Sequence, residues 1–227
     1  MFAKGIFGFS LWEPLILIGL VTFLAACGDD DSDFVSRPDG KGSSSNAAVV
    51  SDSIGNLTDF RDGQAYRTVT IGTQTWMAEN LNYKTANSFC YEDKASNCEK
   101  YGRLYLWDAA LKACPEGWHL PTKAEFETLF TAVGDSSVAG KMLKSTSGWT
   151  AQIGFTNEDA FGFSALPAGY RYFNGEYFIE GSGTLFWNST EDYGSFAYYV
   201  GIDFNDDSAL LLAGDKDNGF SVRCLKD

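Results

Sequence analysis

The stretch TKAEFETLFTAV at residues 122–133 decides how the central part of this chain folds. Thr122 and Glu125 have the spacing of a capping box, in which each side chain bonds to the backbone amide of the other residue. Four apolar residues then follow at the spacing of one helix face: Phe126, Leu129, Phe130 and Val133. The stretch therefore predicts an amphipathic helix that begins after Thr122 and packs one face against a core.

The residues around this helix predict a hairpin and two more helices. Residues 66–71 and 73–77 are rich in β-branched and aromatic side chains on both sides of Gly72, which is typical of two strands joined by a tight turn. Helices are also predicted for residues 104–113 and 138–143. All of these elements precede the most aromatic part of the chain.

The chain from residue 155 onward is punctuated by glycine and predicts short strands. We expect them at residues 163–166, 170–173, 177–179, 185–187, 196–204, 209–213 and 220–224. Because helices come first, strands come later and no internal repeat is visible, we expect one α+β domain over residues 58–227.

Residues 1–26 have the features of a bacterial signal peptide. Lys4 provides a positive charge, and residues 14–26 (PLILIGLVTFLAA) form an apolar run that is short for a membrane-spanning helix. The run ends in residues 24–27 (LAAC), which resemble the lipobox of bacterial lipoproteins, so we expect Cys27 to be lipidated. An ordinary cleaved signal peptide followed by a chance cysteine is the alternative.

Residues 27–57 predict a disordered acidic tether. They are rich in Ser, Gly, Asp and Asn, and such a stretch buries too little apolar surface to offset the entropy of ordering. The run GDDDSD at residues 28–33 resembles a surface-export signal, with a solvated spacer as the alternative. We expect a lipid anchor in the outer membrane and display at the cell surface. The formal net charge of −13 disfavours nucleic acid as a partner.

Four cysteines remain when Cys27 is set aside, an even number that suits disulfides in an exported protein: Cys90, Cys98, Cys114 and Cys224. Four cysteines allow three pairings. We favour Cys90–Cys98, which closes a short loop, together with Cys114–Cys224, which ties the middle of the domain to its last strand. Metal ligation is the rival use, but the chain has no C-x-x-C motif and one histidine.

Five segments, in this order and spacing, resemble the Fibrobacter succinogenes major paralogous domain: residues 71–83 (IGTQTWMAENLNY), 101–129 (YGRLYLWDAALKACPEGWHLPTKAEFETL), 162–171 (GFSALPAGYR), 186–191 (FWNSTE) and 219–227 (GFSVRCLKD). The resemblance implies a C-type-lectin-like fold with two helices, a small irregular sheet and a long loop region. It also implies a disulfide from the helical half to the final strand, where Cys114 and Cys224 lie. It gives a fold and a lipoprotein location but no reaction.

The chain departs from two functional types that share this fold. Calcium-dependent lectins carry a Trp-Asn-Asp triplet, whereas Trp187 and Asn188 are followed here by Ser189, and the lectins' proline-containing triplet is also missing. Formylglycine-generating enzymes share a run similar to residues 119–125 (HLPTKAE), but they need a reactive cysteine pair. The four cysteines of this domain are expected in disulfides, and this weakens the oxidase hypothesis.

Two polar groups are candidates for chemistry. His119 is the only histidine, and its Gly-Trp-His-Leu-Pro setting favours a structural hydrogen bond over general-base catalysis. The D-x-N-x-D pattern of calcium loops is formed by Asp203, Asn205 and Asp207. An EF-hand would also need glycine and glutamate where the chain has Ser208 and Gly214, so a solvated turn competes with calcium.

Residues 172–177 (YFNGEY) predict an exposed hairpin tip around Asn174-Gly175. Sugars stack on exposed aromatic rings, and the candidate ligand-binding residues are Tyr172, Phe173, Asn174 and Tyr177. The alternative is that these rings belong to the core, which needs aromatic residues because aliphatic ones are few.

We therefore expect a non-catalytic binding module, with glycan or plant-fibre polysaccharide as the leading ligand. A structural or protein–protein component of the cell envelope is the second hypothesis, and it predicts an exposed apolar patch. The third is an enzyme, either a cysteine-dependent oxidase or a hydrolase, which predicts a free thiol or a clustered carboxylate pair.

Overall fold

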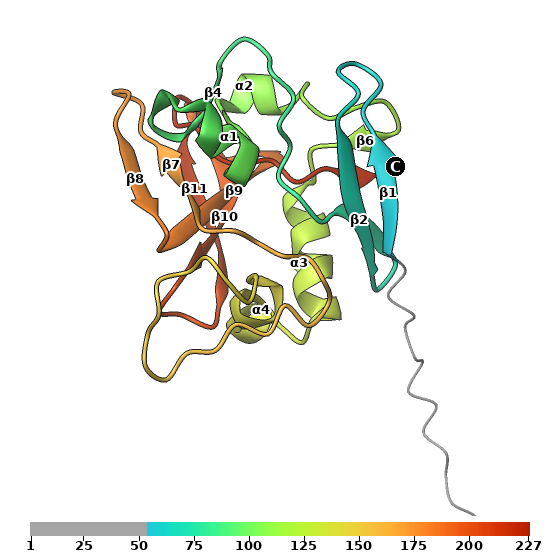
Figure 1. Ribbon diagram of the computed structural model, residues 1–227, viewed down its shortest axis with the longest axis vertical. Coiled ribbons are helices and arrows are strands. Elements are labelled where there is room, and N and C mark those ends of the chain that lie inside the picture. Colours follow the sequence, from blue (N-terminus) through green and yellow to red (C-terminus); the bar gives the residue numbers. More distant parts are fainter. Residues whose placement is uncertain (1–53) are drawn as a thin grey trace, which may run out of the picture. The chain divides into compact units, whose positions relative to one another are not determined.

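The computed structural model describes residues 54–227, which form two five-stranded sheets with helices between and beside them (Figure 1). Sheet 1 has the order β1-β2-β3-β12-β6, with β1 at Ile54–Thr58, β2 at Ala65–Ile71, β3 at Gln74–Met77, β12 at Leu225–Lys226 and β6 at Trp118–His119. Sheet 2 has the order β11-β10-β9-β7-β8, with β11 at Ala209–Asp215, β10 at Phe196–Asp203, β9 at Gly183–Glu191, β7 at Ala168–Arg171 and β8 at Tyr177–Glu180. The predicted signal peptide, Cys27 and most of the tether lie outside the described residues.

The described residues also contain four α-helices and a 3-10 turn: η1 at Tyr91–Asp93, α1 at Ala95–Tyr101, α2 at Trp107–Ala110, α3 at Lys123–Ala132 and α4 at Ser136–Leu143. A small separate pair is formed by β4 (Ser88–Phe89) and β5 (Leu104–Tyr105). The α+β class is thus confirmed. Within residues 54–227, no helix has the length and apolar character needed to cross a membrane.

Helix α3 begins where the capping box predicted. The Thr122 hydroxyl accepts a hydrogen bond from the Glu125 amide at 3.2 Å, and the Glu125 carboxylate accepts one from the Thr122 amide at 2.7 Å. The apolar face of α3 lies between the two sheets (Figure 1). Its Phe126 ring packs 5.0 Å from the Trp76 ring of sheet 1, and the same cluster includes Phe186 of sheet 2. One helix face therefore joins both sheets into a core.

A second core lies on the other side of sheet 2. Trp187 and Phe220 stack with ring centroids 4.1 Å apart, and the Trp187 indole donates to the Tyr105 carbonyl at 2.8 Å. Cys114 and Cys224 form a disulfide beside this core, and Cys90 and Cys98 form the other. Both predicted pairings are confirmed.

The predicted hairpins are confirmed, and their turns lie where glycine was expected. Strands β2 and β3 pair antiparallel and turn after Ile71, which pairs with Gln74. Strands β7 and β8 pair likewise, and the Tyr172 amide donates to the Glu176 carbonyl across the tip at 2.7 Å. Helix α4 also agrees with its prediction and starts two residues earlier, after the capping side chain of Asp135.

Several predicted elements are wrong. Residues 104–113 contain β5 and only the short α2, because Leu104 and Tyr105 pair with β4 and Tyr105 is also hydrogen-bonded to Phe220. Residues 163–166 are not a strand, since Ser164 has a φ of 53° that breaks an extended run. Residues 220–224 make only isolated bridges, and the last strand is β12. The described residues include β1 at Ile54–Thr58, inside the predicted tether, because β1 pairs along β2.

Candidate functional site

A hollow of about 260 Å³ lies between the long loop after α4 and the turn between β10 and β11. We call it the loop pocket, and it is lined by Thr146, Ser147, Trp149, Thr150, Ala151, Gln152, Phe155, Thr156, Asn157 and Phe204. The long loop is the wide yellow and orange segment that follows α4 at the bottom of Figure 1. The lining combines three aromatic rings with hydroxyl and amide side chains, which is the chemistry that sugar-binding sites use.

Backbone and side-chain hydrogen bonds hold the long loop in place. The Trp149 indole donates to the Ser145 hydroxyl at 3.1 Å and to the Ala165 carbonyl at 3.0 Å. The Thr150 amide donates to the carbonyl of Gly181, in the turn between β8 and β9, at 2.7 Å. The edge of the Trp149 ring is therefore fixed by hydrogen bonds within the protein.

The buried ammonium of Lys144 holds the other wall of the loop pocket. Its Nζ donates to the carbonyls of Asp203 and Asp206 at 2.9 and 2.8 Å, one on each side of Phe204. The same ammonium lies 5.5 Å from the centre of the Trp149 ring. Burial lowers the pKa of Lys144, although the carboxylates of the turn oppose that shift. Lys144 thus connects both walls.

Helix α4 sets the position of this turn by close packing. The Lys141 amide donates to the Asp207 carbonyl at 2.9 Å. A Cβ atom on Gly140 would overlap the Ser208 carbonyl, so only glycine permits this approach. The turn between β10 and β11 is therefore held from two sides, by Lys144 and by the backbone of α4.

The predicted calcium ligands lie in this same turn. Asp203, Asn205 and Asp207 surround a loop whose carbonyls bind Lys144, and the Asp203 carboxylate accepts from the Asn205 amide at 3.3 Å. In the part of the chain that the structure describes, no group of three or more His, Cys, Asp or Glu side chains is arranged to hold a metal ion. The carboxylates do not gather into a ligand set, because the loop closes around an ammonium.

The predicted aromatic hairpin presents three of its four candidate residues to solvent, and two of these three are aromatic. Tyr172 and Phe173 are 36% and 54% exposed, with ring centroids 4.3 Å apart. Tyr177 instead donates its hydroxyl to Asp93 at 2.9 Å and packs on Tyr91, and Asn174 bonds to the Glu176 carboxylate. We call Tyr172 and Phe173 the hairpin rings; they form a small exposed platform separate from the lining of the loop pocket.

His119 connects the capped helix to the end of the chain. Its Nδ1 lies 2.7 Å from the Asp227 carboxylate and its Nε2 lies 3.1 Å from the Glu125 carboxylate. Burial alone lowers the pKa of His119, but the hydrogen bonds to these two carboxylates outweigh burial and raise it. Glu125 is the same residue that caps α3. The histidine therefore lies in a structural hydrogen-bond network, as its sequence setting suggested.

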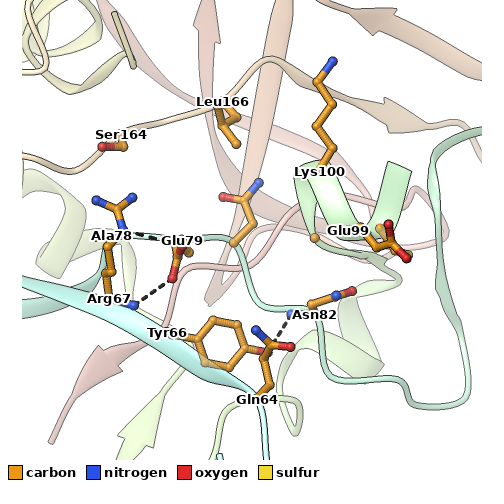
Figure 2. Close-up of a pocket in the computed structure, with 13 residues that line it drawn as sticks. Gln64, Tyr66, Arg67, Ala78, Glu79, Asn82, Glu99, Lys100, Ser164 and Leu166 are labelled. Atoms are coloured by element: carbon orange, nitrogen blue, oxygen red, sulfur yellow. Dashed lines mark hydrogen bonds and ion pairs between the residues drawn. The ribbon is translucent and has the colours of Figure 1, made fainter. Parts of the chain in front are cut away.

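Figure 2 shows a second, smaller hollow of about 160 Å³ between β2, residues 78–82 and the end of α1. Its charged side chains partly neutralise one another, since Arg67 pairs with Glu79 at 3.5 Å. Asn80 also lines this hollow, and its side-chain amide donates to the Tyr101 carbonyl and accepts from the buried guanidinium of Arg223. Most of its polar groups are therefore already bonded within the protein, which makes it the weaker candidate.

The loop pocket was not predicted from the sequence, although one signal for it exists. Residues 146–157 (TSGWTAQIGFTN) place two aromatic residues among hydroxyl and amide side chains. Phe204 carries no local signal, because it lies inside the D-x-N-x-D pattern, for which a solvated turn and a calcium loop are the competing interpretations. Only the fold brings it to the same hollow.

Comparison with known proteins identifies the family. No curated protein and no solved structure matches the chain. The family described as the Fibrobacter succinogenes major domain matches residues 69–226, from β2 to the last strand. That match covers well over half of the sequence and includes both disulfides, α3, the long loop and sheet 2. The chain therefore belongs to the Fibrobacter succinogenes major domain family.

Proposed function

We propose that this chain is a non-catalytic lipoprotein of the outer-membrane surface that binds glycan or plant-fibre polysaccharide through the loop pocket. The lipobox-like sequence before Cys27 and the acidic run after it support the anchor and the location. The pair of helices α3 and α4, the long loop and the Cys114–Cys224 bridge support a C-type-lectin-like fold. The step from this fold to binding is an analogy.

The lining of the loop pocket carries the proposal. Small-ligand sites combine apolar surface with a few polar groups that fix orientation, and this hollow offers three rings among several hydroxyl and amide groups. The side chains of Gln152, Thr156 and Asn157 form no hydrogen bond with any other described residue. Their donors and acceptors are therefore available to sugar hydroxyls. Its volume of about 260 Å³ lies just below the roughly 300–1,000 Å³ of pockets for drug-sized ligands, so it suits a small ligand such as one sugar unit.

The test is binding of the full-length protein, purified in detergent, to soluble polysaccharides followed by affinity electrophoresis. We expect Phe155→Ala to weaken binding by roughly tenfold, because loss of one stacked ring is worth about 1 kcal/mol or more. Phe155 is 36% exposed, so this change costs little stability. Tyr193→Ala removes a ring that is 87% exposed and outside the pocket, and it is the matched control.

The outcomes distinguish the two candidate platforms. Loss of binding in Tyr172→Ala or Phe173→Ala, with Phe155→Ala unaffected, would move the site to the hairpin rings. Binding of no polysaccharide on a panel of plant and bacterial polymers would refute the proposed function.

An alternative function is a protein–protein component of the cell envelope, and one observation favours it. The outer face of sheet 2 carries a row in which Leu185, Gly201 and Leu210 pair across three strands. Leu210 and Leu212 are 47% and 41% exposed, and a shallow hollow of about 170 Å³ lies over this row. Exposed apolar patches mark interaction sites. If Leu210→Ser binds polysaccharide as wild type does, the outer face of sheet 2 is not part of the polysaccharide site and is available for a protein partner.

The oxidase hypothesis requires a free thiol. Within residues 54–227 the four cysteines are all in disulfides, and the remaining cysteine of the chain is the predicted lipidation site. Thiol titration of the unreduced protein tests this point, since a free thiol in the domain would restore the oxidase hypothesis.

A further inference from the structure

The charges around the loop pocket restrict the kind of sugar that it accepts. None of the described residues that line the hollow is ionisable. The smaller hollow of Figure 2 differs, because Arg67, Glu79, Glu99 and Lys100 all line it. A carboxylate or sulfate group in the loop pocket would lose water without gaining a charged partner, and burial of an unpaired charge is costly.

The two lysines at the end of α4, Lys141 and Lys144, are already engaged. Lys144 is fully buried, and its ammonium is held by the carbonyls of Asp203 and Asp206. Lys141 pairs with Glu158 at 2.6 Å. Neither ammonium is free to bind an anionic sugar.

The adjoining turn carries acidic side chains, but Asp203 and Asp206 line the neighbouring hollow over sheet 2 and not the loop pocket. Asp203 and Asp206 belong to the turn that contributes Phe204 to the lining, and hydrogen bonds from Ser208 lower the pKa of Asp206 and keep it ionised. The carbonyls that this turn would offer to a cation already bind Lys144, so the internal ammonium holds the turn in place of a metal ion.

We infer that the loop pocket binds neutral sugar units without a metal ion and rejects uronic and sulfated sugars. This inference rests on the proposed function and adds the ligand class. The hydroxyl groups of a neutral sugar can form hydrogen bonds with the hydroxyl and amide groups of the lining. The sugar ring can stack on Trp149, Phe155 or Phe204. Lys144 is a positioning residue that holds both walls and does not contact the ligand.

The experiment compares polymers that differ only in charge. Cello-oligosaccharides and xylo-oligosaccharides are tested alongside C6-oxidised cello-oligosaccharides, in which each CH₂OH has become a carboxylate, by calorimetry with the full-length protein in detergent. We expect the oxidised form to bind more than about tenfold more weakly than its neutral parent. Neutral binding should be unchanged by EDTA and by salt, because no ion pair forms.

A charge-introducing variant supplies the positive control. Gln152→Lys places an ammonium in the lining and should strengthen binding of the oxidised oligosaccharide by about tenfold. Thr73→Lys adds the same charge in the exposed turn between β2 and β3 of sheet 1, and it should leave both affinities unchanged.

Each outcome has a separate meaning. Equal affinity for neutral and oxidised forms would overturn the inference while leaving glycan binding intact, and so would loss of neutral binding in EDTA. Failure of every oligosaccharide and polysaccharide to bind would instead contradict the proposed function itself.

Discussion

Two buried basic side chains, Lys144 and Arg223, are fixed by neutral oxygens and not by carboxylates. Both are fully buried, and Arg223 donates to Asn80 and to three main-chain carbonyls. Buried charges are tolerated when their hydrogen bonds are satisfied, and removal of one partner then strongly destabilises the folded state. The hydrogen bonds of each side chain therefore connect segments that are distant in sequence.

Lys144→Met tests this role in the loop pocket. The methionine keeps the volume but donates no hydrogen bond, so the carbonyls of Asp203 and Asp206 lose their partner at a cost of about 1–3 kcal/mol. Urea unfolding measures the loss. Lys141→Met is the control, since its surface pair with Glu158 contributes about 0–1 kcal/mol. Equal stability of wild type and Lys144→Met would show that the ammonium does not hold the turn.

His119 makes stability depend on pH in a defined direction. Its two carboxylate partners raise its pKa in the folded state, so its contribution is complete below the unfolded value near 6.5 and is lost as pH rises through the folded pKa. Burial raises the pKa of Glu125, but hydrogen bonds from Thr122 and His119 outweigh it and lower the pKa. The Glu125 contribution is therefore lost as pH falls through that lowered value.

We expect His119→Gln to destabilise the protein most near pH 6 and least near pH 9. Urea midpoints of wild type and variant, measured at each pH, give the difference. A difference that stays constant across this range would mean that protonated His119 contributes nothing, and the network would then be held by Thr122 and Glu125 alone.

At the scale of elements, the N-terminus of α3 is the feature with the clearest local cause. Thr122→Ala removes the acceptor for the Glu125 amide and should cost about 1 kcal/mol in urea unfolding. Thr128→Ala is the matched control, because its hydroxyl only bonds back to the Ala124 carbonyl within the helix. Alanine has the higher helix propensity there, so we expect a change near zero or a slight gain.

The elements that were predicted correctly are those whose cause is local. The capping box fixes α3, and the glycine turns fix the hairpins β2–β3 and β7–β8. The elements that were missed depend on a distant partner. β5 exists because Leu104 and Tyr105 pair with β4, and Tyr105 also bonds to Phe220, although residues 104–113 have helix-forming composition. β1 is likewise extended because β2 offers an edge.

The candidate site was less predictable than the fold for a related reason. The hairpin rings were found because an Asn-Gly turn is a local signal. The loop pocket combines Trp149 and Phe155 with Phe204, and a polar loop has no periodicity that indicates which residues meet. Lys144 also has no sequence signal, since a single lysine at the end of a short helix is usually solvated. Its burial follows from packing of α4 against the turn.

At the scale of the whole described domain, two disulfides of very different span stabilise the same fold. Cys114–Cys224 closes a separation of 110 residues and links the segment after α2 to the chain just before β12. Cys90–Cys98 closes a separation of 8 residues around η1 and α1. Because loop-closure entropy grows with length, the long bridge restricts the unfolded chain more than the short one.

We therefore expect the paired replacement Cys114→Ala with Cys224→Ala to cost more than Cys90→Ala with Cys98→Ala. The chain-entropy estimate is about 5 kcal/mol for the long loop and about 2.5 kcal/mol for the short one. Urea unfolding of the two double variants, each without free thiols in the domain, gives the comparison. A larger loss of unfolding free energy from removal of Cys90–Cys98 would mean that contacts in the folded state, and not loop closure, decide the contribution of this bridge. Arg103 makes such contacts, since it donates to both of the sulfur atoms. Loss of the long bridge should also loosen sheet 1, because β12 joins β3 to β6 directly after Cys224.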